Sequence, residues 1–350
     1  MLIGKEMPMY TVKFNELKVF MHNILKKLGM TESNIETVVD IYIEITKRGV
    51  GHHDIHNFPS RVERLMSGKI TVNPEFSLLA SYGCMESWDG DNGLGELINT
   101  FLMERAVSLA QDHGIGFSTV RNSNHYLASS PYTTQATERG CIGIVIAKGP
   151  PSMGVPGTDG KVIGQSPVGF AFPTKREWPV ILDICLAYAS GEQLLRRAKG
   201  GQPVPEWWGV GPDGRPTSDA EQLLRGTKYP IGGHKGFGLA ILCELLTGVF
   251  SQGPVLDEQE GPDMAWKSSS HTAVAIKADA LMDMDSYIGR SSDLIDRIDA
   301  RAPSIHIPGQ HSYKNKVEFE RSASIDISGE LFDKLNQCAK ALNVEGLAIL

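Results

Sequence analysis

The chain has 350 residues, of which 41% are apolar and 21% are charged, and its formal net charge at pH 7 is −7. This length and apolar content suffice for a sizeable core and for more than one lobe. The acidic balance argues against a general nucleic-acid binder, which normally presents a basic face. There is no run of about 18 apolar residues and no signal-peptide pattern, so we expect no membrane span and a cytoplasmic location.

Helical periodicity marks the N-terminal part of the chain. Apolar residues recur every three or four positions from Leu17 to Leu28, and residues 13–48 are predicted to form two helices. Gly29 suits the left-handed position that ends the first helix, and Thr31 is placed to cap the second. A third helix is expected over residues 57–70. These elements predict an N-terminal helical lobe over residues 1–76.

The sequence pattern changes near residue 78, where short runs rich in β-branched residues begin to alternate with helix-like segments. Such alternation predicts an α/β core. The apolar run at 236–253 is interpreted as a buried helix, residues 271–281 as a further strand, and residues 328–344 as a terminal helix. The predicted lobes are therefore an α/β lobe over 77–311 and a helical lobe of 1–76 joined by C-terminal helices at about 312–350. The other predicted strands are 114–120, 141–147, 168–173 and 179–184.

Five cysteines lie far apart and form no CxxC pair, which argues against a disulfide framework or a cysteine zinc site. Cys141, Cys185 and Cys243 fall in apolar runs and are expected to pack as small buried hydrophobes.

The first stretch that could form a functional site is "GHHDIHN", residues 51–57. His52 and His56 are four residues apart, a spacing that metal ligands often have on a helix, and together with His53 they allow a metal-dependent hydrolase or lyase. The competing interpretation is a polar loop with Asp54 near a helix cap. No HExxH motif is present, and the spacing favours the loop.

The second stretch is "NSNHYLASS", residues 122–130, in which His125 sits among small polar residues after a predicted strand. A histidine exchanges protons near neutral pH, so His125 is a candidate acid or base. Taken alone, the segment is favoured as an ordinary surface loop.

Two glycine-rich stretches could approach a cofactor closely. In "GTDGKVIGQSPVGFAFP" (157–173) the glycines precede a strand, and this pattern is either a ligand contact or a simple turn. In "GGHKGFG" (232–238) the glycines open a helix, whose free N–H groups and Lys235 suit a phosphate. A tight helix start against a neighbour explains the same pattern. The sequence contains neither a GxGxxG fingerprint nor a Walker A loop.

Taken in order, these stretches resemble the malate/L-lactate dehydrogenase family of NAD(P)-dependent oxidoreductases, which lacks the Rossmann fold. The resemblance covers most of the chain and rests on six motifs in the family's order. The stretches that carry it are "VRNSNHYLASSPY", "GQSPVGFAFP", "LDICLAYASGEQLL", "PDGRPTSDAEQLL", "IGGHKGFGLAILCELL" and "HIPGQ".

The resemblance implies a non-Rossmann α/β fold with a helical lobe, a homodimer, and a site between lobes or subunits. It places His125 at the catalytic centre and His53 at the substrate, where the latter is a second candidate proton donor. It also implies NAD or NADP as cofactor, without deciding between them. The implied cofactor contacts are Ser123, Asn124, Ser166, Pro167, Asp183, Gly233, His234, Lys235, Gly236, Pro308 and Gly309.

The chain departs from the family pattern at "HHDIHN". The family often has an arginine that can hold a substrate carboxylate where this chain has Asn57. Arg48, Arg61 or Arg121 are candidates to replace it. Gln165 and Ser166 also stand where the family has Thr-Asn. The substrate is therefore expected to differ from plain malate or lactate.

The sequence thus predicts reversible hydride transfer between nicotinamide and C2 of a 2-hydroxy or 2-oxo acid, with a cyclic or N-substituted imino acid as the close variant. His125 is the first candidate acid/base and His53 the second, and Lys148 is a candidate to polarise the substrate. The alternatives are the histidine metal site described above and a non-catalytic relative that binds ligand without turnover. The expected partners are a small-molecule acid and a second subunit, with no nucleic acid or membrane.

Overall fold

The computed structural model describes residues 8–51, 53–158, 160–259 and 269–350. The chain divides into two compact units, which are described separately here. The first unit joins the N-terminal segment up to Pro74 with Ser304–Leu350, and the second is Glu75–Pro303.

The first unit is mainly helical, and the two helices predicted over residues 13–48 are confirmed. Their apolar faces are buried, with Leu17, Met21 and Ile24 completely inaccessible. A short antiparallel pair, β1 (Met9–Lys13) and β11 (Ser324–Ser328), ties the two ends of the chain together. The helices are α1 (Phe14–Lys27), α2 (Glu32–Lys47), α3 (Phe58–Met66), α11 (Gln310–Ser322) and α12 (Gly329–Leu342), with the 3-10 turn η1 (Ile55–Asn57).

The helix ends in this unit test the predicted caps. Gly29 has φ +83° and takes the left-handed conformation expected after α1. Thr31 does occupy the N-cap position of α2, but its side chain makes no capping hydrogen bond, so that prediction is wrong. Instead the Thr31 backbone N–H donates to Asn73 Oδ1 at 2.9 Å. The side chain of Asn73 thus stabilises the turn before α2.

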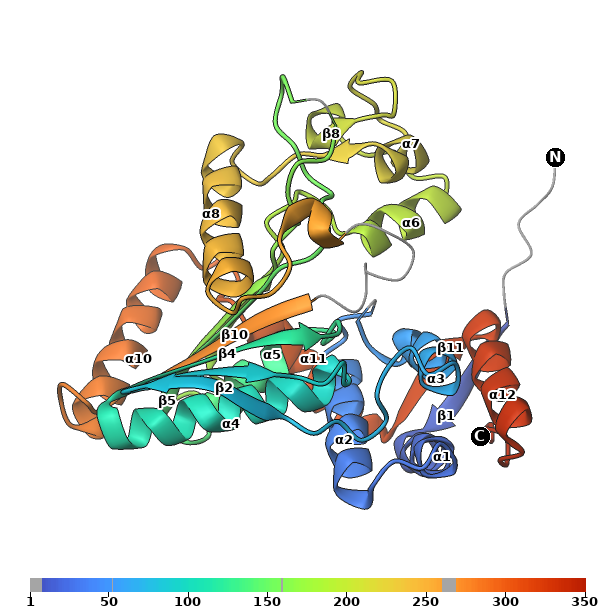
Figure 1. Ribbon diagram of the computed structural model, residues 1–350, viewed down its shortest axis with the longest axis horizontal. Coiled ribbons are helices and arrows are strands. Elements are labelled where there is room, and N and C mark those ends of the chain that lie inside the picture. Colours follow the sequence, from blue (N-terminus) through green and yellow to red (C-terminus); the bar gives the residue numbers. More distant parts are fainter. Residues whose placement is uncertain (1–7, 52, 159, 260–268) are drawn as a thin grey trace. The chain divides into compact units, whose positions relative to one another are not determined.

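The second unit is built on a seven-stranded mixed sheet with the order β2-β3-β4-β10-β5-β6-β7 (Figure 1). Only the β3–β4 pair is parallel, and the remaining pairs of this sheet are antiparallel. The four strands predicted between 114 and 184 are confirmed, and so is the strand predicted at 271–281. The strands are β2 (Ser77–Tyr82), β3 (Met85–Asp89), β4 (Ile115–Ser123), β5 (Cys141–Ala147), β6 (Val168–Phe172), β7 (Val180–Ile184) and β10 (Ser269–Lys277).

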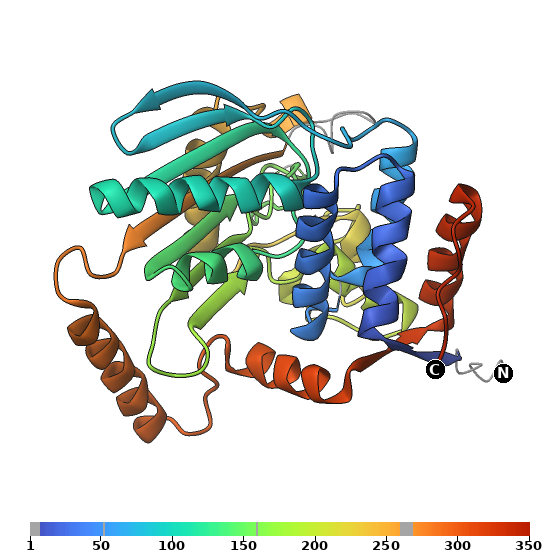
Figure 2. The same cartoon turned by 90° about the horizontal axis from the view of Figure 1, so that it is seen from below.

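Helices cover both faces of the central strands. α4 (Gly95–His113) and α5 (Ser130–Thr137) pack on one face, whereas α8 (His234–Glu244) and η3 (Leu245–Val249) pack on the other (Figures 1 and 2). Two glycines allow the close approach: a Cβ at Gly116 would lie 1.9 Å from the Ala106 carbonyl oxygen of α4, and a Cβ at Gly143 would lie 2.7 Å from that of Thr133 in α5. The sheet and α5 together position the segment that follows β4.

The helix predicted over 236–253 is confirmed by α8 and η3, but the prediction that its apolar side chains are buried is wrong. Small and polar residues, among them Gly236, Ala240 and Thr247, face the sheet, whereas the large apolar side chains face outward. The exposed fractions are Leu239 50%, Ile241 42%, Leu242 55%, Leu245 49%, Leu246 41%, Val249 56% and Phe250 52%. Hydrophobicity alone could not tell burial in the core from an exposed apolar face.

The remaining elements of the second unit surround the sheet. β8 (Gly209–Val210) pairs with β9 (Thr227–Lys228). The five cysteines are free thiols, with Cys141 and Cys243 buried as expected and Cys185 only partly buried. Among the described helices, none is long and apolar enough to cross a membrane. The other helical elements are α6 (Gly191–Lys199), η2 (Glu206–Trp208), α7 (Ala220–Arg225), η4 (Leu256–Gln259) and α10 (Met284–Arg301).

Candidate active site

The segment between β4 and α5 carries His125 in an unusual backbone conformation. Asn122 and Leu127 have φ of +56° and +71°, in the left-handed region that residues with side chains rarely adopt. Such residues persist where surrounding contacts determine the backbone, and they cluster at functional sites. The segment is therefore more than the ordinary surface loop that its sequence alone favoured.

The His125 ring has a defined orientation. Its Nδ1 accepts a hydrogen bond from the Leu127 backbone N–H at 3.1 Å, and the side chain is only partly exposed. Because Nδ1 accepts, the proton of the neutral ring lies on Nε2. His125 is thereby prepared to donate a hydrogen bond through Nε2 to a bound oxygen atom.

Asp183 anchors the same segment from the end of β7. Its Oδ2 accepts hydrogen bonds from the backbone N–H groups of Ser129 and Ser130, at 2.7 and 3.0 Å. A carboxylate at this position satisfies free N–H groups at the start of α5 and complements the helix dipole. The sequence indicated Asp183 only as a cofactor contact and gave no sign of this anchoring contact.

A buried histidine supports the segment from β10. Nδ1 of His271 accepts from Asn99 Nδ2 at 2.6 Å and lies 3.3 Å from Ser123 Oγ. Burial, and secondarily the charge of Lys148, lower the pKa of His271 to about 3, so the ring is neutral near pH 7. Sequence reasoning missed His271 and Asn99, because an isolated histidine in a strand and an asparagine in a helix form no motif.

Asn124 is held by its amide nitrogen beside the start of α4. Nδ2 donates to the carbonyl oxygens of Asn92 and Gly93, at 3.0 and 2.9 Å. Its Oδ1 is buried and has no hydrogen-bond partner in the described structure. Gly95 makes this packing possible, since a Cβ there would lie 2.3 Å from the Asn124 carbonyl oxygen. The unsatisfied Oδ1 is an acceptor available to a ligand.

The "GQSP" stretch forms a second constrained turn before β6. Ser166 is buried and has φ +38°. The Pro167 carbonyl oxygen accepts from Ala147 N–H at 3.0 Å, and the Gln165 carbonyl oxygen accepts from Leu186 N–H at 2.8 Å. This turn therefore lies against the ends of β5 and β7.

The start of α8 has the features of an anion site that the sequence suggested. Gly233 is the N-cap, with φ +62° and no side-chain cap, while His234 and Lys235 are exposed. Gly236 is buried, and a Cβ there would lie 2.2 Å from the Ile231 carbonyl oxygen. Close packing thus explains Gly236, while the role of Gly233 and Lys235 toward a phosphate stays a prediction.

Lys148, the candidate for polarising the substrate, is a deeply buried residue at the end of β5. Its Nζ lies 3.9 Å from Glu244 Oε1 and donates to the Pro254 carbonyl oxygen. Burial lowers the pKa of Lys148 to about 8, against the raising effect of Glu244. The contact with Glu244 joins the end of β5 to α8, and a role toward substrate stays a prediction.

The histidine-rich stretch of the first unit forms a capped turn around Asp54 and His56. Asp54 is the N-cap of η1: it accepts from the His56 backbone N–H at 3.1 Å, and its Oδ1 lies 2.6 Å from His56 Nδ1. The predicted capping position of Asp54 is confirmed. His53 is partly buried beside it, and His52 lies outside the described residues. Within those residues no group of three or more His, Cys, Asp or Glu is arranged to hold a metal.

The proposed replacements for the missing arginine occupy different places. In the first unit, Arg48 is buried and forms an ion pair with Glu44 at 2.7 Å, and Arg61 is buried on α3. Arg121, in the second unit, pairs with Asp89 at 3.2 Å. Asn57, which stands at the expected arginine position, ends η1 and is partly exposed.

The remaining cofactor candidates, Pro308 and Gly309, belong to the first unit. Gly309 has φ +94° and is the N-cap of α11. A cavity of about 700 Å³ lies elsewhere in the second unit, between α10 and the β6–β7 end, and none of the candidate residues lines it.

Comparison with solved structures defines the class of protein. The sulfolactate dehydrogenase from Methanocaldococcus jannaschii superimposes with a TM-score of 0.88 and 27% identity, over 96% of this chain and 98% of that one. The predicted α/β fold with a helical part is confirmed by this match. The fold is thus that of a dehydrogenase with a mixed rather than a parallel Rossmann sheet.

Sequence comparison supplies the family. The model of the malate/L-lactate dehydrogenase family matches residues 12–336, and the chain belongs to this family of oxidoreductases. A malate dehydrogenase from Pyrococcus abyssi is 28% identical over 347 residues, 96% of each chain. A 2,3-diketo-L-gulonate reductase from Salmonella heidelberg is 28% identical over 332 residues, 93% of this chain and 98% of the relative.

Proposed function

We propose that this protein is an NAD(P)-dependent dehydrogenase that transfers a hydride reversibly between nicotinamide and C2 of a 2-hydroxy or 2-oxo acid. The observation that carries the proposal is the His125 segment, with its ring oriented by Leu127 N–H and its backbone anchored by Asp183. The similarity to a malate dehydrogenase and to a 2,3-diketo-L-gulonate reductase supports the substrate class.

Several described residues fit a dinucleotide. The exposed start of α8, with Gly233, His234 and Lys235, suits a diphosphate, because a helix N-terminus without a side-chain cap and a lysine lie next to each other in the chain there. The buried, unsatisfied Oδ1 of Asn124 suits an amide N–H donor, which a nicotinamide carboxamide has. Within the second unit we assign cofactor binding to these residues together with Ser123, Ser166, Pro167, Asp183 and Gly236. Pro308 and Gly309 of the first unit stay cofactor candidates from the family resemblance alone.

When bound, the reduced cofactor supplies the hydride, and the protein has to orient the acid and manage one proton. We propose that His125 Nε2–H donates to the C2 oxygen and polarises the carbonyl. Protonating its Nδ1 would break the hydrogen bond from Leu127 N–H, so a polarising role suits the neutral ring. His53 is then the candidate that supplies the proton to the oxygen.

We further propose that two copies pair through the outward face of α8 and η3. Its seven large apolar side chains, each about half exposed, present on the order of 600 Å² of apolar surface, close to the ~800 Å² that each partner buries in a stable interface. In light scattering after size exclusion, Leu242→Glu should yield monomer. Leu281→Glu, at a residue that is 96% exposed, should leave the dimer intact, and a dimeric Leu242→Glu would contradict the proposal.

The activity is tested on a panel of 2-oxo acids and cyclic imino acids. Oxidation of NADH and NADPH is followed by the loss of their absorbance at about 340 nm. We expect turnover of at least one 2-oxo acid. Turnover of imino acids alone would show that the substrate is an imino acid and not a 2-oxo acid. Binding of NADH without any turnover would favour the alternative that the protein is a non-catalytic relative. His113→Ala, at an exposed histidine that ends α4, is the matched control for His125→Ala.

A further inference from the structure

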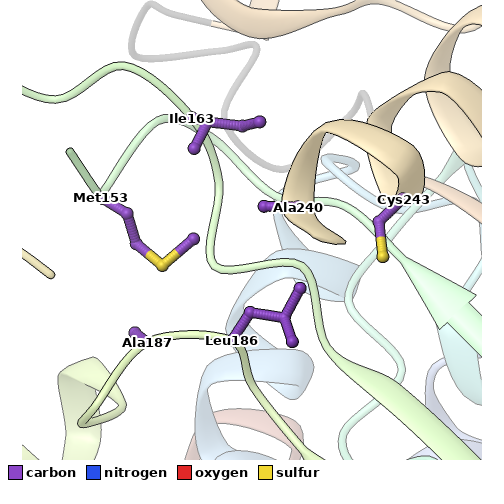
Figure 3. Packing of buried hydrophobic residues seen from close by; sticks show 6 residues of the cluster. All are labelled: Met153, Ile163, Leu186, Ala187, Ala240 and Cys243. Carbon is purple, nitrogen blue, oxygen red and sulfur yellow. The ribbon is translucent and has the colours of Figure 1, made fainter. Parts of the chain in front are cut away.

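A buried lysine lies beside the "GQSP" turn and has no part in the chemistry described so far. Lys228 is only 7% exposed. Its backbone is fixed on two sides: β9 pairs it with Gly209, and it forms an isolated parallel bridge with Met153. Met153 belongs to the apolar cluster of Leu186, Ala187 and Ala240 shown in Figure 3. The backbone of Lys228 is thus fixed, and the residue lies at the edge of this apolar cluster.

The ammonium of Lys228 has a neutral partner. Its Nζ donates to Gln165 Oε1 at 3.0 Å, although an ammonium has three N–H donors. None of the described carboxylates pairs with it. Cys185 lies nearby, but burial raises the pKa of this thiol, so it is uncharged near neutral pH. Lys161 adds a second positive charge to the surroundings of Lys228.

Other buried cations of the chain show the contrast. Lys148 is 3% exposed and has Glu244 at 3.9 Å, and Arg48 is 4% exposed and has Glu44 at 2.7 Å. Buried charges in proteins are normally paired in this way, because an unpaired one is costly. Burial lowers the pKa of Lys228 to about 8, which still leaves most of the side chain charged at pH 7.

We propose that Lys228 and Gln165 form an oxyanion site that binds an acid group of one of the two reactants. Gln165 and Cys185 are both partly exposed, so the ammonium lies just below the surface, within reach of a carboxylate or phosphate oxygen. Gln165 directly precedes Ser166 and Pro167, and Cys185 follows Asp183 by two residues. The site therefore belongs to the wall that we assign to the cofactor, and its assignment to a reactant rests on the proposed function.

The oxyanion site also gives a physical meaning to a departure from the family pattern. The side chain of Gln165, which differs here from the pattern that the family resemblance implies, carries the hydrogen bond to Lys228. A glutamine oxygen reaches the ammonium without neutralising it, so the positive charge stays available to a ligand. A carboxylate at this position would have closed the site with an internal ion pair.

The first experiment measures anion binding without the reaction. Thermal unfolding is followed with inorganic phosphate as the probe, in wild type, Lys228→Met and the surface control Lys175→Met, at an exposed lysine beyond the far end of β6. We expect phosphate to raise the melting temperature of wild type and of Lys175→Met, and Lys228→Met to bind it about 10- to 100-fold more weakly. No phosphate effect in wild type, or an equal effect in Lys228→Met, would overturn the site.

The same experiment separates a ligand site from a structural role. Without phosphate, Lys228→Met should melt at or above the wild-type temperature, because it removes a buried charge that none of the described carboxylates neutralises. A clearly lower melting temperature would mean that Lys228 stabilises the fold and would count against the proposal. If Lys228→Met does not fold, Lys228→Gln serves as the second neutral variant with the same expected loss of phosphate binding.

A second experiment identifies the source of the anion. If Lys228 binds a cofactor phosphate, Lys228→Met raises the Kd of NADH or NADPH about 10- to 100-fold and leaves the KM of the 2-oxo acid unchanged. If it binds the substrate acid, KM rises and the cofactor Kd is unchanged. Unaltered values of both constants would overturn the assignment to a reactant. A phosphate effect that depends on Lys228, in a protein without dehydrogenase activity, would leave the anion site standing and reject only the proposed function.

Discussion

Removing the Asp183 carboxylate tests how the His125 segment is held. Its Oδ2 accepts two backbone N–H groups at 2.7 and 3.0 Å. Each such bond to a charged acceptor at a helix start contributes about 1–2 kcal/mol, and water can partly replace the Asp183 carboxylate because this residue is exposed. We therefore expect Asp183→Ala to lower the free energy of unfolding by about 2–3 kcal/mol. Asp183→Asn, which keeps an acceptor oxygen, should lose about half of that.

The assay is urea unfolding followed by circular dichroism, with Asp219→Ala as the matched control. Asp219 accepts from the N–H groups of Glu221 and Gln222 at 2.8 and 3.2 Å at the start of α7, in an exposed setting. Its removal should cost about 1 kcal/mol. The reasoning is refuted if Asp183→Ala is no less stable than Asp219→Ala. Normal stability with a large loss of NADH affinity would instead mark Asp183 as a cofactor contact alone.

Three further outcomes follow from the same contacts. His125→Ala should lower turnover by about two to four orders of magnitude and leave NADH affinity within about twofold, and wild-type turnover would exclude its role. Lys148→Met should destabilise the protein by about 3 kcal/mol in urea unfolding, because Glu244 is left buried without its cation, and a neutral effect would contradict that pairing. Arg105 hydrogen bonds to Glu86 and lowers the pKa of that carboxyl in the folded protein. The pair therefore stabilises the fold fully above the pKa of an unfolded glutamate, about 4.3, and this contribution is lost as the pH falls through the lower pKa of the folded state. Arg105→Met should therefore cost about 1 kcal/mol at pH 7 and progressively less below about pH 4, whereas a cost independent of pH would show that packing, not charge, is lost.

Much of the fold could be predicted from local patterns. The 3.6-residue periodicity of α1 and α2 and the β-branched runs of β4 to β7 correspond to buried faces, and buried faces leave their period in a sequence. The α8 helix escaped this logic. Its sequence is apolar around most of its circumference, and small residues such as Gly236 and Ala240, rather than leucines, face the sheet.

The candidate site was predictable only where residues adjacent in the chain act together. His125 stands out by its small polar neighbours and by resemblance to a family. His271 and Asp183 reach the same segment from two other elements, and Asn99 of a third element holds His271. Such long-range contacts have no spacing rule in the sequence. The buried position of Lys228 was equally hidden, because a lysine in "GTKYPIGG" is typical of an exposed strand edge.

The central claim is that hydride passes between nicotinamide and C2 of an acid, and isotope transfer tests it most directly. The enzyme is supplied with NADH or NADPH in which both C4 hydrogens are deuterium, and with the 2-oxo acid that gives turnover. The product is analysed by NMR and mass spectrometry. Our account predicts one deuterium on C2 of the 2-hydroxy product and none on its oxygen after exchange with water. A product without deuterium at C2, formed while cofactor is consumed, would contradict it.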